Sequence, residues 1–99
     1  MTDYKIIIPA RYNSKRFPGK PLVKIHGKTM LERVWLNAMD SAASEVIIAT
    51  DDQRIEAVAK NFGAHVCLTS NEHKSGTDRI IEAIEILGLR DDEIILNVQ

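Results

Sequence analysis

Four short apolar runs rich in β-branched residues, separated by stretches with helical patterns, constrain the fold of this chain most. The runs cover residues 4–10, 45–50, 64–69 and 93–99. Continuous apolar runs of this length are typical of strands buried on both faces, as in parallel sheets. Strands that alternate with helices predict an α/β fold, in which right-handed crossovers place the helices on the faces of the sheet.

The three intervening helices are predicted from apolar spacing and from their ends. Thr29 followed by Glu32 fits a capping box before the first helix. Asp51 or Asp52 is expected to cap the second helix, which Gly63 ends. The side chains expected to face the sheet are Leu31, Val34, Trp35, Ala38 and Met39, then Ile55, Val58, Ala59 and Phe62, then Ile80, Ile81, Ile84 and Leu87. Residues 11–27 are expected to form a long loop, with an extended piece at 22–25.

Composition excludes several protein classes. With 44% apolar and 27% charged residues, the chain is not of a disordered or collagen-like type. No apolar run approaches the roughly 18 residues of a membrane span, and the N-terminus lacks the pattern of a secretory signal. The single cysteine, Cys67, excludes an internal disulfide framework and a cysteine-cluster zinc site. Cys67 is expected to pack as a small apolar residue.

Charge is unevenly distributed along the chain. Residues 11–28 contain six basic residues and no acidic ones, so a formal net charge of −1 leaves −7 on the rest. This basic segment follows the first predicted strand, and open α/β sheets bind ligands at the carboxyl ends of their strands. Because phosphate oxygens need several donors and positive charge together, a polyphosphate is the expected ligand.

The basic segment fits a polyphosphate site better than it fits a solvated patch, a nucleic-acid surface or a known phosphate motif. A solvated basic patch would need no specific ligand. Nucleic acid is disfavoured, since the rest of the chain is acidic and the segment has only two aromatic residues, Tyr12 and Phe17. A P-loop is excluded because Leu22 stands where that motif needs glycine, and no Gly-x-Gly-x-x-Gly follows the first strand.

A second polar segment, residues 69–79, follows the third predicted strand and should lie on the same edge of the sheet. Ser75 and Gly76 stand at a helix start, where free N–H groups favour ligand acceptor atoms, although simple capping by Ser75 or Thr77 also explains them. Arg79 is harder to explain structurally, because a cation in the first turn opposes the helix dipole. Helix capping explains the paired Asp51 and Asp52 more simply than a metal does.

Four blocks of the sequence together resemble one enzyme family. The blocks are IIPARYNSKRFPGKPL, ATDD, TSNEHKSGTDR and NVQ, and they occur in order along the whole chain. In this combination they are similar to the 3-deoxy-manno-octulosonate (KDO) cytidylyltransferases, whereas sialic-acid cytidylyltransferases resemble the later blocks less well. The resemblance implies a Rossmann-like three-layer αβα nucleotidyltransferase fold with a mainly parallel sheet. It also implies a cytoplasmic enzyme that forms CMP-KDO and pyrophosphate from CTP and KDO, with Mg²⁺, for lipopolysaccharide biosynthesis.

The resemblance also implies roles for individual residues. Arg11 and Lys20 are expected to be catalytic, by stabilising the transition state and the pyrophosphate leaving group. Gln99 is expected to contact the sugar acid. The expected nucleotide-binding residues are Ala10, Arg11, Ser14, Lys15, Arg16 and Lys20 around the triphosphate, and Ser75, Gly76 and Arg79 around the cytidine.

In that family NVQ is followed by Gly-Asp-Glu-Pro, whose aspartate binds Mg²⁺, so no metal ligand is expected within residues 1–99. Residues 1–99 are expected to be one CTP-binding part of a longer nucleotidyltransferase domain, homodimeric when full length and inactive as an isolated chain. CTP and KDO are the expected partners, without nucleic acid or membrane. Two alternatives stay open: a cytidylyltransferase for a related acid (sialic acid, 8-amino-KDO or a phosphonate), and a non-catalytic nucleotide-binding module.

Overall fold

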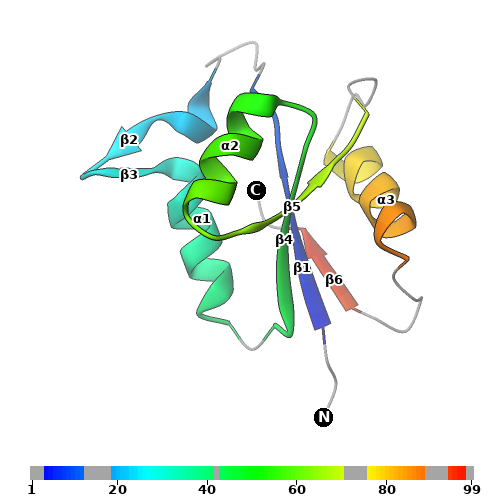
Figure 1. Cartoon of the computed structure of the whole chain (residues 1–99). Coiled ribbons are helices and arrows are strands. Elements are labelled where there is room, and N and C mark those ends of the chain that lie inside the picture. The colour runs from blue at the N-terminus through cyan, green and yellow to red at the C-terminus, as the bar shows by residue number, and fades with distance from the viewer. Residues whose placement is uncertain (1–3, 13–18, 42, 71–75, 89–93, 98–99) are drawn as a thin grey trace.

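A parallel sheet forms the centre of the chain in a computed structural model that describes residues 4–12, 19–41, 43–70, 76–88 and 94–97. Its strands are β1 (Tyr4–Ala10), β4 (Glu45–Thr50), β5 (His65–Leu68) and β6 (Ile94–Asn97). They lie in the order β5-β4-β1-β6, and every neighbouring pair is parallel (Figure 1). The predicted parallel α/β sheet is confirmed.

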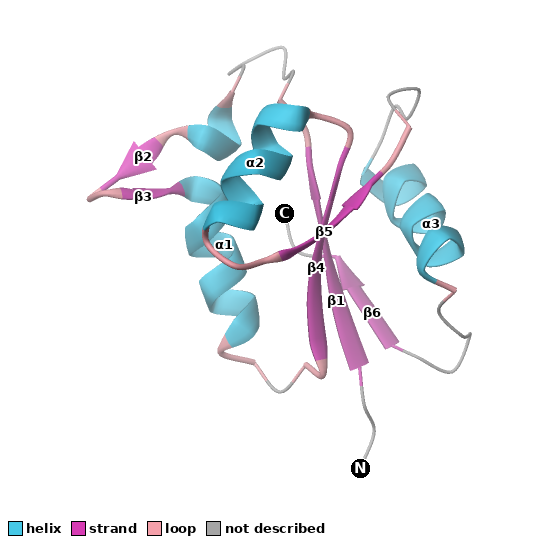
Figure 2. Cartoon of the chain, in the orientation of Figure 1, coloured by secondary structure: helices cyan, strands magenta, loops and turns pink. Residues whose placement is uncertain are grey.

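Helices cover both faces of this sheet. Figure 2 shows α1 (Met30–Met39) and α2 (Gln53–Asn61) on one side and α3 (Gly76–Leu87) on the other. Alternate residues of the central strands face the two layers, because successive side chains of a strand point to opposite faces. Ile6, Ile8, Val46 and Ile48 belong to the core on the α1 and α2 side, and Ile7, Ile47, Ala49 and Cys67 to the core on the α3 side. The expected three-layer αβα arrangement is therefore confirmed.

The strand order places a topological switch beside β1. The chain moves from β1 to β4 and then to β5 on one side, and β6 returns to pair with the other side of β1. Open α/β sheets bind ligands outside the carboxyl ends of their strands at such a switch. The carboxyl ends of β1 and its neighbouring strands are therefore the expected ligand-binding edge of the sheet.

Local side-chain contacts fix the starts of two helices as expected. Oγ1 of Thr29 accepts a hydrogen bond from the backbone N–H of Glu32 at 3.0 Å. At α2 the cap is Asp52 rather than Asp51, since Oδ1 of Asp52 accepts from the N–H groups of Arg54 at 2.8 Å and Ile55 at 3.2 Å. Each cap satisfies donors that would otherwise lack a partner inside the helix.

The apolar stripes were predicted too broadly. Met39, Ile81 and Leu87 are 52%, 51% and 39% exposed, although all three were expected to face the sheet. Ile81 follows Ile80, so the two side chains are about 100° apart around the axis and only one can face the sheet. Ala83, which was not predicted, is fully buried in that layer.

The loop expected over residues 11–27, with an extended piece at 22–25, is more structured than predicted in its described part. Residues 20–29 form a 3₁₀ helix, η1 (Lys20–Leu22), and a small antiparallel pair, β2 (Lys24–Ile25) and β3 (Lys28–Thr29). The two residues between these strands, His26 and Gly27, have positive φ angles of 52° and 83°. Positive φ at both central positions is the requirement of a tight type I′ hairpin turn. In the described part of the chain, no helix is both long and apolar enough to cross a bilayer.

Candidate functional site

The carboxyl ends of β1, β4 and β5 gather polar and charged residues at one edge of the sheet. Ala10 ends β1, is buried and pairs with Thr50, the last residue of β4. The backbone N–H of Thr69, after β5, donates to the carbonyl of Thr50 at 2.9 Å. Arg11, which follows Ala10, is exposed at this edge. The structure thus presents Arg11 where the sequence predicted a ligand.

Lys20 lies on the other side of a chain reversal that begins just after Arg11. The backbone N–H of Gly19 donates to the carbonyl of Tyr12 at 2.7 Å, which joins the residues adjacent to Arg11 and Lys20. Lys20 then opens η1 with an exposed side chain. The two expected catalytic cations, Arg11 and Lys20, therefore flank the backbone hydrogen bond between Tyr12 and Gly19.

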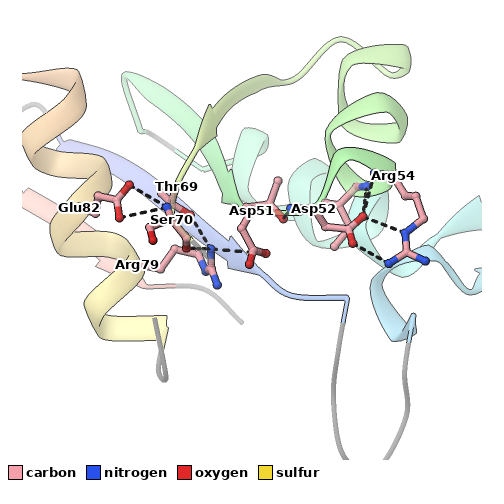
Figure 3. A network of polar contacts seen from close by, with 9 residues as sticks. Asp51, Asp52, Arg54, Thr69, Ser70, Arg79 and Glu82 are labelled. Atoms are coloured by element: carbon pink, nitrogen blue, oxygen red, sulfur yellow. Dashed lines mark hydrogen bonds and ion pairs between the residues drawn. The ribbon is translucent and has the colours of Figure 1, made fainter. Parts of the chain in front are cut away.

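Arg79 is the most deeply buried charged residue of the described core, with 1% of its surface exposed. Its Nη1 donates to Oγ1 of Thr69 and, at 3.4 Å, to the carbonyl of Ser70. The same nitrogen lies 3.7 Å from Oδ1 of Asp51 (Figure 3). A guanidinium in the first turn of α3 therefore reaches the ends of both β4 and β5, which explains why a cation is kept there against the helix dipole.

Glu82 holds the same strand end from the next turn of α3. Its two carboxylate oxygens accept from the backbone N–H of Ser70 at 2.9 and 3.1 Å (Figure 3). Arg79 and Glu82 together fix Thr69 and Ser70, the first two residues of the polar segment 69–79 that was expected to contain the cytidine contacts. Gly76, one of the expected cytidine contacts, begins α3.

Asp52 and Arg54 form a second charged pair at the start of α2. The Arg54 side chain donates through Nε to Oδ1 of Asp52 at 3.2 Å and through Nη2 to Oδ2 at 2.7 Å. This two-point hydrogen bond holds the pKa of the Asp52 carboxyl below its ordinary value, against the opposing effect of partial burial.

The described residues do not fit a metal site. None of them form a group of three or more His, Cys, Asp or Glu side chains able to hold an ion. The paired carboxylates already have protein partners, because Asp51 faces Arg79 and Asp52 caps α2 and binds Arg54. The expectation of a helix cap in this pair is confirmed for Asp52, which caps α2.

Cys67 packs as predicted. It is buried in the core on the α3 side, and this burial raises the pKa of its thiol, with a smaller contribution from the charge of Glu82. A thiol held in its neutral form is a poor nucleophile. Cys67 therefore belongs to the core rather than to the site.

The structure describes only some of the residues expected to form the site. Ser14, Lys15, Arg16, Ser75 and Gln99 lie outside the described residues. Sequence reasoning missed the contact of Arg54 with the Tyr12 ring and the contacts of Thr69 and Ser70 with Arg79 and Glu82 of α3. Each joins segments that spacing along the chain does not relate, and only their position beside predicted ligand segments could have drawn attention to them.

Comparisons with known proteins identify the family to which the chain belongs. A family model described as "Cytidylyltransferase" matches residues 5–99. The chain is 54% identical over 99 residues to the 3-deoxy-manno-octulosonate cytidylyltransferase of Pasteurella multocida (strain Pm70) and 56% identical over 97 residues to that of Coxiella burnetii (strain RSA 493 / Nine Mile phase I). These matches cover 100% and 98% of this chain, but only 38% and 39% of the relatives.

A solved structure extends the comparison to three dimensions. The structure of CMP:2-keto-3-deoxy-manno-octonic acid synthetase complexed with CTP matches with a TM-score of 0.89 and 42% sequence identity. The match covers 98% of this chain and 39% of that protein. At this identity and coverage, the likeness extends through the whole sheet and its helices.

Proposed function

Because the chain belongs to the cytidylyltransferase family, we propose that it is the CTP-binding part of an enzyme that transfers CMP from CTP to KDO. The observation that carries this proposal is the 54% identity, over all 99 residues, to an enzyme named for that activity. The exposed Arg11 directly after β1 and the exposed Lys20 of η1 support it, since a triphosphate needs concentrated positive charge. Residues 1–99 would form one part of a longer nucleotidyltransferase domain.

The proposed reaction is a displacement at phosphorus. The anomeric hydroxyl oxygen of KDO forms a bond to the α-phosphorus of CTP, and the bond from that phosphorus to the β-phosphate oxygen breaks. Pyrophosphate leaves and the hydroxyl loses its proton. A protein assists such a step mainly by positioning the reactants and neutralising charge. Arg11 and Lys20 are the groups proposed to do this for the developing charge on the phosphates.

The remaining proposed contacts divide between the two ends of the nucleotide. Ala10, Ser14, Lys15 and Arg16 are placed with Arg11 and Lys20 around the triphosphate. Ser75 and Gly76 are placed beside the cytidine, and Gln99 beside the sugar acid.

Arg79 is given an indirect role at the cytidine end. Its guanidinium is 1% exposed and contacts Thr69, Ser70 and Asp51, which favours support of the strand ends. In this role Arg79 would keep the polar segment after β5 in the position from which it reads the base.

We also propose the cellular setting implied by the family. Mg²⁺ would be the cofactor, held by ligands of the longer domain that are not among residues 1–99, and would supply charge neutralisation on the phosphates. The enzyme would work in the cytoplasm as a homodimer and provide an activated sugar for lipopolysaccharide biosynthesis.

A hybrid protein tests the proposal. It consists of this chain followed by the portion of the Pasteurella multocida relative that lies beyond the match. With CTP, KDO and Mg²⁺, the hybrid is expected to release pyrophosphate, and Lys20→Ala is expected to lower kcat by about 100-fold or more. The isolated 99-residue chain is expected to release none.

The outcomes separate the alternatives. Pyrophosphate release by the isolated chain, or unchanged turnover in the Lys20→Ala hybrid, would contradict the proposed roles. A folded hybrid that binds CTP without turnover with any acid would favour a non-catalytic nucleotide-binding module. A panel with sialic acid, 8-amino-KDO and a phosphonate in place of KDO identifies a cytidylyltransferase for a related acid.

A further inference from the structure

The ring of Tyr12 is held between parts of the molecule that are distant in sequence. Cζ of Arg54, in the first turn of α2, lies 3.3 Å from the centroid of the Tyr12 ring. Gly19 also contacts this ring, because a Cβ at position 19 would lie only 3.1 Å from Cε2 of Tyr12. A guanidinium over an aromatic face is attracted by the ring quadrupole. Tyr12 is therefore tied to α2 by Arg54 and to the chain reversal by Gly19.

The backbone closes at the same place. The N–H of Gly19 donates to the carbonyl of Tyr12 at 2.7 Å, and Gly19 is buried with a φ of 75°. Residues with side chains rarely adopt this conformation, and the ring leaves little space for one. Positions 12 and 19 are thus joined by a backbone hydrogen bond and by packing of the ring.

Arg54 is itself held in place. The Asp52 carboxylate accepts hydrogen bonds from Nε of Arg54 at 3.2 Å and from Nη2 of Arg54 at 2.7 Å. The same carboxylate caps α2. The capping bonds fix the carboxylate, and the carboxylate fixes the plane of the guanidinium. The orientation of Arg54 over Tyr12 is consequently set by the start of α2 rather than by the chain reversal.

We propose that Tyr12 and Arg54 are positioning residues that set Arg11 and Lys20 in place for a triphosphate, which rests on the proposed function. Arg11 immediately precedes Tyr12, and Lys20 immediately follows Gly19. Holding Tyr12 against Gly19 and α2 therefore fixes the spacing of the two cations before the ligand arrives. Such preorganisation raises affinity by reducing the ordering that binding would otherwise require.

Two substitution pairs separate position from charge. Tyr12→Leu removes the ring without changing any charge, and Tyr12→Phe keeps it. Arg54→Ala removes the cation, and Arg54→Lys keeps the charge but loses the planar two-point hydrogen bond to Asp52. Lys60→Ala is the matched control, because Lys60 is an exposed cation of the same helix, paired with Glu56 at 3.2 Å.

Two measurements are made on each variant of the 99-residue chain. Hydrogen exchange of the Gly19 N–H reports its backbone hydrogen bond to Tyr12 without any ligand. Calorimetric titration with inorganic tripolyphosphate and with CMP measures how strongly Arg11 and Lys20 bind a chain of phosphates. CMP serves as the comparison because it lacks the β- and γ-phosphates. Tyr12→Leu and Arg54→Ala are expected to speed Gly19 exchange and to weaken tripolyphosphate binding by about two- to fivefold, with little change for CMP.

Tyr12→Phe and Lys60→Ala are expected to stay close to the parent chain in both measurements. Arg54→Lys is expected to resemble Arg54→Ala in Gly19 exchange, because lysine keeps the charge but cannot make the two-point hydrogen bond to Asp52. Unchanged Gly19 exchange in Tyr12→Leu and Arg54→Ala would overturn the positioning role, as would equal losses for tripolyphosphate and CMP. A parent chain that binds neither tripolyphosphate nor, in an added titration, CTP would contradict the proposed function instead. In that case Gly19 exchange still decides whether Tyr12 and Arg54 hold the chain reversal.

Discussion

Removing the carboxylate of Glu82 should loosen the end of β5 selectively. Both of its oxygens accept the one N–H of Ser70, at 2.9 and 3.1 Å, and the residue is half-buried. A hydrogen bond to a charged group contributes about 1.5–3 kcal/mol, and partial exposure favours the lower end of that range. Glu82→Ala is therefore expected to lower the free energy of unfolding by about 1.5 kcal/mol. For a domain of this size, that corresponds to a fall in Tm of about 6–12 °C.

Hydrogen exchange locates the effect. Exchange of the Ser70 N–H should accelerate by about tenfold in Glu82→Ala, because 1.4 kcal/mol corresponds to a factor of ten. Glu85→Ala is the control, since Glu85 is an exposed glutamate on the same helix. Equal shifts in Tm for the two variants, with Ser70 exchange unchanged, would refute the assignment of Glu82 to the strand end.

Two further predictions concern the start of α2 and the chain reversal. The Asp52 carboxyl has a pKa below its ordinary value of 3.8, so its stabilisation is complete above about that pH and is lost as the pH falls through the lower folded-state value. In Asp52→Asn the free energy of unfolding should therefore depend less on pH in the acid range than in the parent chain. The same dependence in both would contradict the pairing with Arg54. Gly19→Ala should destabilise by about 1–2 kcal/mol or more in urea unfolding, because it adds both strain at positive φ and a contact with Tyr12. Gly27→Ala has a similar φ of 83° with no neighbour within 4 Å, so a larger loss at Gly19 measures the ring contact, and equal losses would exclude it.

The sequence predicted those features of the fold that depend on local pattern. Buried β-branched runs identified the strands. Short-range capping identified the start at Thr29 and narrowed the second start to Asp51 or Asp52, because the atoms of each cap lie within three residues of each other. The hairpin at 24–29 was missed because its turn, His26-Gly27, needs positive φ at a residue that rarely adopts it.

The sequence predicted which described residues would gather at the carboxyl edge of the sheet, but not the contacts that hold them there. Following the strand ends leads to Arg11 and to the segment before α3, since parallel strands share one carboxyl edge. The partners of Arg79 and Tyr12 come from other elements, Asp51 after β4 and Arg54 in α2. Such pairings depend on how the helices pack on the sheet, and no spacing in one sequence encodes them.

Titration of this chain with CTP and with CMP tests the central claim most directly. If the exposed cations after β1 and in η1 bind a triphosphate, CTP should bind at least about tenfold more tightly than CMP. Lys20→Ala and Arg11→Ala should each reduce this preference, because each removes a positive charge proposed to bind the β- and γ-phosphates, which CMP lacks. Equal affinities for the two nucleotides, or a preference for CTP that survives both substitutions, would contradict the account.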